Sequence, residues 1–225
     1  MTSIDKRPLL IGITGSIGTG KTTFCNLVKS HYPVYSADAI VYEIERRPEI
    51  NARLSEMFAL EIKPDGYISH RELGDIVFQD KEKLRQLNEF IHPLTLAEMQ
   101  RIVNTAEGSV LCFEVPLLFE AQLERCFDFI VTIIASESCI YERLKTKDRF
   151  SGAAIRHRLS AQLPQIDKAE KSDLVIDNSL SLAVLQAQVR LFLDKISTLP
   201  FKPLRQPFYP LYFMYDYRFY QGRSR

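Results

Sequence analysis

The 225-residue chain lacks a charge excess of either sign. Lys and Arg total 29 and Asp and Glu total 28, so the formal net charge is +1. This balance gives no overall attraction to nucleic acid or to an acidic membrane, so any affinity for a polyanion has to come from a local cluster. We therefore expect no nucleic-acid partner.

Long apolar runs are also absent. The run PLLIGI follows Lys6 and Arg7 in the manner of a signal peptide, but Asp5 precedes it and glycines end it. No run approaches the roughly 18 apolar residues that a membrane helix needs. These features predict a cytoplasmic protein without a membrane partner.

Cysteine is sparse, and its spacing excludes the common zinc and redox motifs. Cys25, Cys112, Cys126 and Cys139 form no C-x-x-C pair and do not combine with histidines at metal-ligand intervals. We expect reduced, mostly buried thiols, as in other cytosolic proteins.

Glycine is concentrated in one place. Of the 9 glycines, four fall in the stretch GITGSIGTGKTTF, which starts at residue 12. The spacing Gly15-x-x-x-x-Gly20-Lys21-Thr22 is typical of a phosphate-binding loop. The apolar run at residues 9–14 predicts a buried strand before it, and residues 22–30 have the apolar spacing of a helix after it. This strand–loop–helix order is the context that the motif requires.

The residue types in this loop suit the binding of ATP. Glycines let successive backbone N–H groups turn inward around a phosphate, and the following helix adds its free N–H groups and the positive end of its dipole. Lys21 can reach the β- and γ-phosphates, and the Thr22 hydroxyl suits Mg²⁺. The expected ATP-binding residues in the loop are Gly15, Gly18, Thr19, Gly20, Lys21, Thr22 and Thr23.

Further short apolar runs predict parallel strands at residues 34–36, 110–115, 129–134 and 174–176. Alternation with helical patterns favours an α/β fold of the P-loop NTPase type, a doubly wound parallel five-stranded sheet flanked by helices. We expect the nucleotide-binding core to comprise residues 8–40, 109–142 and 172–198. Residues 41–108 are then an inserted helical substrate subdomain, 143–171 a charged helical lid, and 199–225 an aromatic and basic tail without an assigned function.

Helical patterns within the insertion cover residues 47–57, 81–90 and 94–104, with a turn at 64–66. His92, followed by Pro93, is expected to end the helix that contains LNEFI. The tail is expected to pack on the core or to lie disordered. Its alternation of aromatic and basic residues also leaves open a nucleic-acid-binding module.

The absence of D-x-x-G and N-K-x-D after the loop disfavours a regulatory GTPase, and nothing supports a motor or transporter ATPase. A small-molecule kinase fits the length, the insertion and the lid. Another nucleoside or nucleotide kinase, or a catalytically impaired nucleotide-binding relative, remains an alternative.

Six segments, in order, make the chain resemble the dephospho-CoA kinase family. They are ITGSIGTGKTT (13–23), VYSADAI (34–40), ISHRELGDIVFQD (68–80), LNEFIHP (87–93), EVPLLFE (114–120) and SDLVIDN (172–178), with Arg158, Gln162 and Lys168 before the last. Departures from the family pattern occur at Ser36, Tyr42, His70, Ile140 and Lys147, and the tail matches nothing in it.

The resemblance implies transfer of the ATP γ-phosphoryl group to the ribose 3′-hydroxyl of dephospho-CoA, the last step of coenzyme A synthesis. Asp38 would orient the attacking hydroxyl, although a helix N-cap is its alternative role. Lys21 and Arg143 would stabilise the transferring group, and Arg149 would add a contact to ATP.

The same resemblance implies where the acceptor binds. Pro116, Leu117 and Leu118 would form a wall against its adenine and ribose, and Glu120 would bond a sugar hydroxyl. The alternative is that this segment is a tight strand-to-helix turn packed in the core. Arg71 and His92 are further candidates for acceptor contacts. The sequence shows no heptad repeat and does not settle the oligomeric state; we expect a monomer, with an oligomer as the alternative.

Overall fold

The computed structural model describes residues 7–147, 150–200 and 208. At its centre lies a five-stranded sheet, entirely parallel, with the strand order β2-β3-β1-β4-β5. The strands are β1 (Leu9–Thr14), β2 (Val34–Ser36), β3 (Val110–Glu114), β4 (Phe129–Ile134) and β5 (Leu174–Asp177). The predicted α/β fold is confirmed, and every predicted strand forms.

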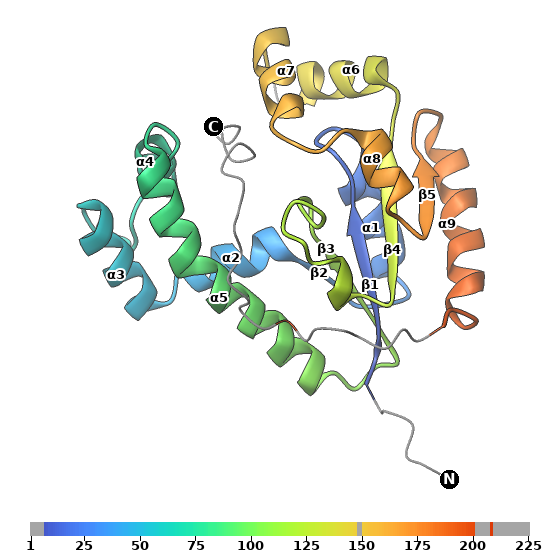
Figure 1. Ribbon diagram of the computed structural model, residues 1–225, viewed down its shortest axis with the longest axis horizontal. Helices are drawn as coiled ribbons and strands as arrows, with labels where there is room; N and C mark the ends of the chain where they lie inside the picture. The colour runs from blue at the N-terminus through green and yellow to red at the C-terminus, as the bar shows by residue number, and fades with distance from the viewer. Residues whose placement is uncertain (1–6, 148–149, 201–207, 209–225) are drawn as a thin grey trace.

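Helices cover the sheet and extend beyond it on two sides (Figure 1). They are α1 (Lys21–Lys29), α2 (Ala37–Glu45), α3 (Pro48–Phe58), α4 (His70–Val77), α5 (Lys81–Thr105), α6 (Glu137–Lys147), α7 (Gly152–Ser160), α8 (Gln165–Glu170) and α9 (Leu182–Ile196), with the 3₁₀ turn η1 (Glu124–Cys126). In Figure 1, α3 and α4 lie to the left of the sheet, whereas α6 and α7 lie above the ends of β1 and β4.

The two faces of the sheet are buried by different helices. All residues of β1 are buried, as expected for a central parallel strand. Ile11 and Ile13 belong to a cluster with Phe24 of α1 and Phe192 of α9, whose ring centroids are 5.7 Å apart. Leu10, on the opposite face, belongs to the cluster that contains α5. The sheet is therefore covered on both sides.

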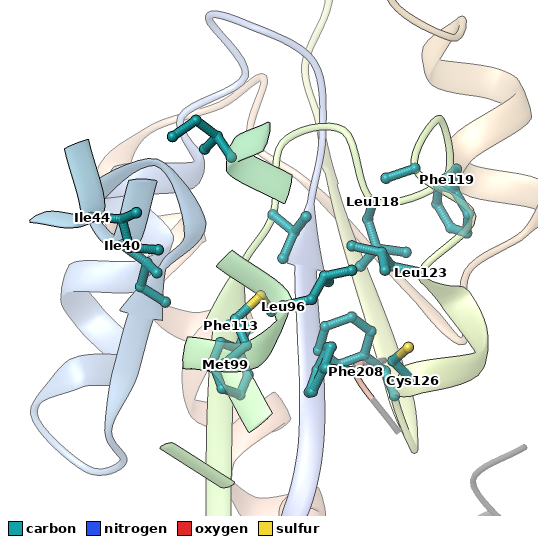
Figure 2. Packing of buried hydrophobic residues seen from close by; sticks show 14 of the residues in the cluster. Ile40, Ile44, Leu96, Met99, Phe113, Leu118, Phe119, Leu123, Cys126 and Phe208 are labelled. Carbon is teal, nitrogen blue, oxygen red and sulfur yellow. The ribbon is translucent and has the colours of Figure 1, made fainter. Parts of the chain in front are cut away.

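The second cluster joins the sheet to the helices of residues 41–108. Figure 2 shows Phe113 of β3 with Ile44 of α2 and with Leu96 and Met99 of α5. The helical region thus shares a continuous core with the sheet. The boundaries proposed for the core, the insertion and the lid remain predictions.

The prediction that His92 and Pro93 end a helix is wrong. Helix α5 runs from Lys81 to Thr105 with Pro93 inside it. A proline in a helix removes one backbone hydrogen bond and costs about 3 kcal/mol. Both halves of α5, however, bury apolar side chains in the same cluster, including Ile91 before the proline and Leu96 after it. This shared packing offsets the proline.

Of the predicted tail, the structure describes only residues 199, 200 and 208. Phe208 is 3% exposed, and its ring centroid lies 5.6 Å from that of Phe113 and 5.5 Å from that of Phe127. Its backbone N–H donates to Oε1 of Gln100 at 2.9 Å, and Figure 2 shows it beside Cys126. Packing on the core is therefore confirmed at Phe208.

All four cysteines are thiols that form no disulfide within the described residues; Cys25, Cys112 and Cys126 are buried and Cys139 is partly buried. Burial raises the pKa of Cys112 and Cys126 to about 12 each, which keeps these thiols protonated and unreactive.

No helix within the described residues has the length and apolar character needed to cross a membrane.

Candidate active site

The glycine-rich loop connects β1 to α1 and can be built only with glycine at two points. Gly15 and Gly20 have φ angles of +144° and +92°, which side chains of L residues rarely adopt. A Cβ atom at Gly20 would lie 2.1 Å from Nδ2 of Asn178, and one at Gly15 would lie 2.2 Å from the carbonyl oxygen of Ile133. Backbone conformation and close packing therefore both require these glycines.

Side chains from distant segments hold the loop in place. Nδ2 of Asn178 donates to the carbonyl of Thr19 at 2.8 Å. The guanidinium group of Arg143, from α6, donates to the carbonyl of Thr19 at 3.3 Å and to that of Asn178 at 2.6 Å. On the other side, Oε1 of Gln162 accepts the N–H of Ile17 at 3.0 Å. These contacts from the end of β5, α6 and the α7–α8 connection fix the conformation of the loop.

The loop borders a cavity of about 1070 Å³, called here the first cavity. Of the predicted ATP-binding residues, it is lined by Gly18, Gly20, Lys21, Thr22 and Thr23. Gly15 and Thr19 do not line it. Thr19 is fully buried, and its hydroxyl donates to the carbonyl of Ser16 at 2.8 Å, so its side chain supports the loop.

The first cavity also gathers the three predicted catalytic residues. Asp38, in the first turn of α2, lines it together with Lys21 and Arg143. The alternative role of Asp38 as a helix N-cap does not apply, because Ser36 occupies the N-cap position. The β2–α2 junction therefore places the carboxylate at the edge of the sheet that carries the loop, as expected for a parallel α/β fold.

Lys21 lies between groups of both signs. Burial lowers the pKa of Lys21 to about 8, against the opposing effects of the Glu114 and Asp38 carboxylates. Its Nζ donates to the carbonyl of Ser16 at 3.1 Å. Burial also raises the pKa of Glu114, with Lys21 acting in the opposite direction. A buried ammonium group beside the phosphate-binding loop is well suited to receive an anionic ligand.

A second cavity, of about 940 Å³, opens between α2, α4 and α5. Its walls are mostly apolar and include Val41, Leu73 and Ile91. Asp38 and Arg158 line both cavities. The two spaces therefore meet at a carboxylate and a guanidinium group, an arrangement that suits two substrates whose reacting groups come together there.

The predicted acceptor residues are dispersed over three environments. Arg71 and His92 line the second cavity, and burial lowers the pKa of His92 to about 4, which keeps it neutral at physiological pH. Pro116 and Leu117 line the first cavity. Leu118 is fully buried in the core, so it lines neither cavity.

Glu120 does not face either cavity, which corrects the expectation that it bonds a sugar hydroxyl. Its side chain is fully buried, and Oε1 lies 2.8 Å from Nζ of Lys168. The N–H of Leu163 donates to the same oxygen at 2.9 Å. Lys168, assigned above to a charged lid, is likewise fully buried and donates to the carbonyl of Pro116 at 3.0 Å. The pair fixes the turn after β3 instead.

Arg149 lies outside the described residues. Sequence reasoning gave no role to Glu114 or Asn178, although both belong to matched segments, and it left Arg158 out of the site. The matched segments could have drawn attention to these residues. Only the structure, however, places Glu114 near Lys21 and Asn178 against Gly20. It also places Arg158 at both cavities.

Among residues 7–147, 150–200 and 208, no group of three or more His, Cys, Asp or Glu side chains could hold a metal ion alone. Thr22, Asp38 and Glu114, whose side chains carry hydroxyl or carboxylate oxygens, nevertheless line the first cavity. Such oxygen ligands suit Mg²⁺, which usually completes its shell with water and substrate phosphates. The donor set fits a nucleotide-bound magnesium ion.

Comparisons with known proteins agree with this arrangement. The sequence model of the dephospho-CoA kinase family matches residues 9–183. A dephospho-CoA kinase of Listeria innocua is 35% identical over 192 residues, which cover 82% of this chain and 96% of that protein. One from Helicobacter pylori is 34% identical over 191 residues, covering 83% and 96%.

Solved structures show the same fold. A crystal structure from Thermus thermophilus matches with a TM-score of 0.75 at 29% identity, covering 85% of this chain and 99% of that one. The dephospho-CoA kinase of Campylobacter jejuni matches with a TM-score of 0.63 at 27% identity, covering 84% and 97%. The chain belongs to the dephospho-CoA kinase family, whose members are kinases that use ATP.

Proposed function

We propose that this chain transfers the γ-phosphoryl group of ATP to the ribose 3′-hydroxyl of dephospho-CoA, with ATP in the first cavity and the acceptor in the second. The observation that carries this proposal is that Asp38 lines both cavities. An attacking hydroxyl held at Asp38 has the phosphate-binding loop on one side and room for the rest of its molecule on the other.

Asp38 acts mainly by orientation. Its carboxylate accepts a hydrogen bond from the 3′-hydroxyl and points the oxygen lone pair at the γ-phosphorus. Phosphoryl transfer passes through a loose transition state, so the proton leaves late and a weak base suffices. Correct positioning then supplies most of the benefit.

Three cations converge on the transferring group. Lys21 supplies a compact charge at the β- and γ-phosphates, while Arg143 and Arg158 line the same cavity. Guanidinium groups can hold two oxygens at once, which suits the charge spread over the equatorial oxygens in the transition state. Arg149 is proposed as a further contact to ATP.

Mg²⁺ is proposed to bind with the nucleotide, held by the Thr22 hydroxyl. When bound, the ion neutralises charge on the phosphate oxygens. We also propose that the enzyme works as a monomer in the cytoplasm.

Arg71 is proposed to bind the acceptor at the mouth of the second cavity, with Pro116 and Leu117 against its ribose in the first.

Incubation of the purified protein with ATP, Mg²⁺ and a panel of hydroxyl acceptors tests the function. The proposal expects transfer to dephospho-CoA and little to other nucleosides or nucleotides. Preference for a different acceptor would refute it.

A further inference from the structure

Asn178 follows β5 and is held from several sides where it meets the phosphate-binding loop. Its backbone N–H donates to the carbonyl of Ile134 in β4 at 2.9 Å. Its own carbonyl accepts from the guanidinium group of Arg143 at 2.6 Å. The residue is 7% exposed and lines the first cavity. The side chain therefore reaches the loop from a fixed backbone.

The side chain of Asn178 makes one directed bond with the loop. Nδ2 donates to the carbonyl oxygen of Thr19 at 2.8 Å. A carbonyl oxygen only accepts hydrogen bonds, so the amide nitrogen of Asn178 has to face it. The same oxygen accepts a longer bond from Arg143, at 3.3 Å. The carbonyl of Thr19 is thus held toward β5 and α6, and the bond from Asn178 is the shorter of the two.

Holding this carbonyl also sets the direction of the next N–H group. The C=O and N–H groups of a trans peptide lie in one plane and point in opposite directions. The N–H of Gly20 therefore points away from the Asn178 side chain. Thr19 is fully buried, whereas Gly20 lines the first cavity. The orientation of this peptide thus decides whether the loop presents an N–H group or a carbonyl oxygen to a phosphate.

Gly20 by itself does not keep the peptide in this orientation. Its φ angle is +92°. Turning over the Thr19–Gly20 peptide would bring that angle into the negative range, which glycine adopts about as readily. The carbonyl oxygen of Thr19 would then face the phosphates and repel them. Glycine makes the required conformation possible, and a neighbouring side chain has to select it.

We propose that Asn178 is the positioning residue that keeps the N–H of Gly20 directed at the phosphates and thereby sets the affinity for a polyphosphate chain. The inference rests on the placement of ATP in the first cavity, which is part of the proposed function. Apparent affinity falls in proportion to the fraction of molecules in the binding-competent state. Loss of the Asn178 bond should therefore weaken every ligand that carries a polyphosphate, with or without a nucleoside.

The test titrates wild type and Asn178→Leu with two magnesium complexes, that of ATP and that of inorganic tripolyphosphate, which has no base or ribose. Leucine has a similar volume but no donor, and the backbone carbonyl that holds Arg143 is retained. Both affinities should fall about tenfold. Asn178→Ser, whose hydroxyl can still donate, should lose less affinity for both ligands, and it replaces the leucine variant if that variant does not fold.

Asn51→Leu is the matched control. Asn51 is also buried, at 2% exposed, and its Nδ2 donates to the carbonyl of Glu45 at 3.2 Å, but it lines neither cavity. This variant removes the same kind of bond and should leave both affinities at the wild-type value.

A loss confined to ATP would place the effect of Asn178 at the nucleoside and overturn the inference. Wild-type affinity of Asn178→Leu for both ligands would also overturn it, even if the Tm without ligand falls. Because the measurement is of binding and not of transfer, it is decided separately from the acceptor. Wild-type enzyme that binds ATP but does not phosphorylate dephospho-CoA would refute the proposed function alone.

Discussion

Nζ of Lys168 lies 2.8 Å from Oε1 of Glu120, and both side chains are fully buried. Glu120 belongs to the turn after β3, and Lys168 belongs to α8. The pair therefore joins the turn after β3 to α8. Lys168 also bonds the carbonyl of Pro116, which lines that cavity. We regard it as a support for the active site rather than a contact to substrate.

Removing one member of this pair should destabilise the protein strongly. Lys168→Met or Glu120→Met leaves a buried charge uncompensated, which typically costs roughly 3–5 kcal/mol. The double variant removes both charges and should be far more stable than the sum of the single losses implies. Urea unfolding of the three variants measures this coupling. Strictly additive losses would show that the two side chains do not stabilise each other.

Gly20→Ala should weaken ATP binding at least about tenfold, because the new Cβ meets Asn178 and the φ angle of +92° is strained. Gly66→Ala is the matched control. Its φ angle is also positive, at +87°, but no atom lies within 4 Å of the added Cβ. Calorimetric titration with ATP should show a loss only for Gly20→Ala. Equal affinity in both variants would mean that the loop tolerates a side chain at this point.

Arg143→Ala should slow transfer more than it weakens ATP binding, although loss of its bonds to the carbonyls of Thr19 and Asn178 should also lower ATP affinity to a smaller extent. Loss of one group that stabilises transition-state charge commonly costs about 10²–10³ in kcat. Steady-state kinetics with varied ATP separates kcat from KM. Arg156→Ala removes an exposed arginine of α7 that lines neither cavity and serves as the control. Similar losses in kcat and in ATP affinity would contradict the assigned role.

ATP affinity should fall as pH rises above about 8, the pKa of Lys21 in the free protein. Phosphate favours the ammonium form, so binding above this pH requires uptake of a proton, and affinity should decline toward tenfold per pH unit. Calorimetry in buffers of different ionisation enthalpy measures the uptake. In Lys21→Met the decline should disappear; a wild-type affinity that stays constant from about pH 7 to 10 would contradict the shift.

The same lowered pKa has an opposite effect on stability. Between about pH 8 and the ordinary value of 10.5, the unfolded chain binds the Lys21 proton and the folded one does not. By linkage, this group makes the nucleotide-free protein more stable as pH rises through that window. Denaturant unfolding of wild type and Lys21→Met would show the difference in slope.

The strands and the phosphate-binding loop could be predicted because their signals are local. Buried parallel strands read as short apolar runs, and the loop requires glycine at fixed points such as Gly20. The continuity of α5 could not be predicted from local signals. Pro93 signals a break, and only the packing of both halves on one cluster overrides it.

The placement of Lys21 and Asp38 at one cavity could be predicted, because each follows a strand at the same edge of the parallel sheet. The burial of a charged pair could not be predicted in this way. Glu120 and Lys168 each read as exposed or functional side chains, because their pairing across 48 positions leaves no trace in the spacing. The second cavity was hidden for the same reason: α2, α4 and α5 meet there only in three dimensions.

The central claim is that Asp38 positions the acceptor hydroxyl against the phosphate-binding loop. The most direct measurement compares wild type and Asp38→Asn with ATP, Mg²⁺ and dephospho-CoA, following both turnover and ATP affinity. The account predicts that the variant binds ATP normally, that it loses most of its turnover, and that the wild-type product carries its new phosphate on the 3′-hydroxyl. A near-normal kcat in the variant, or phosphate on another hydroxyl, would contradict it.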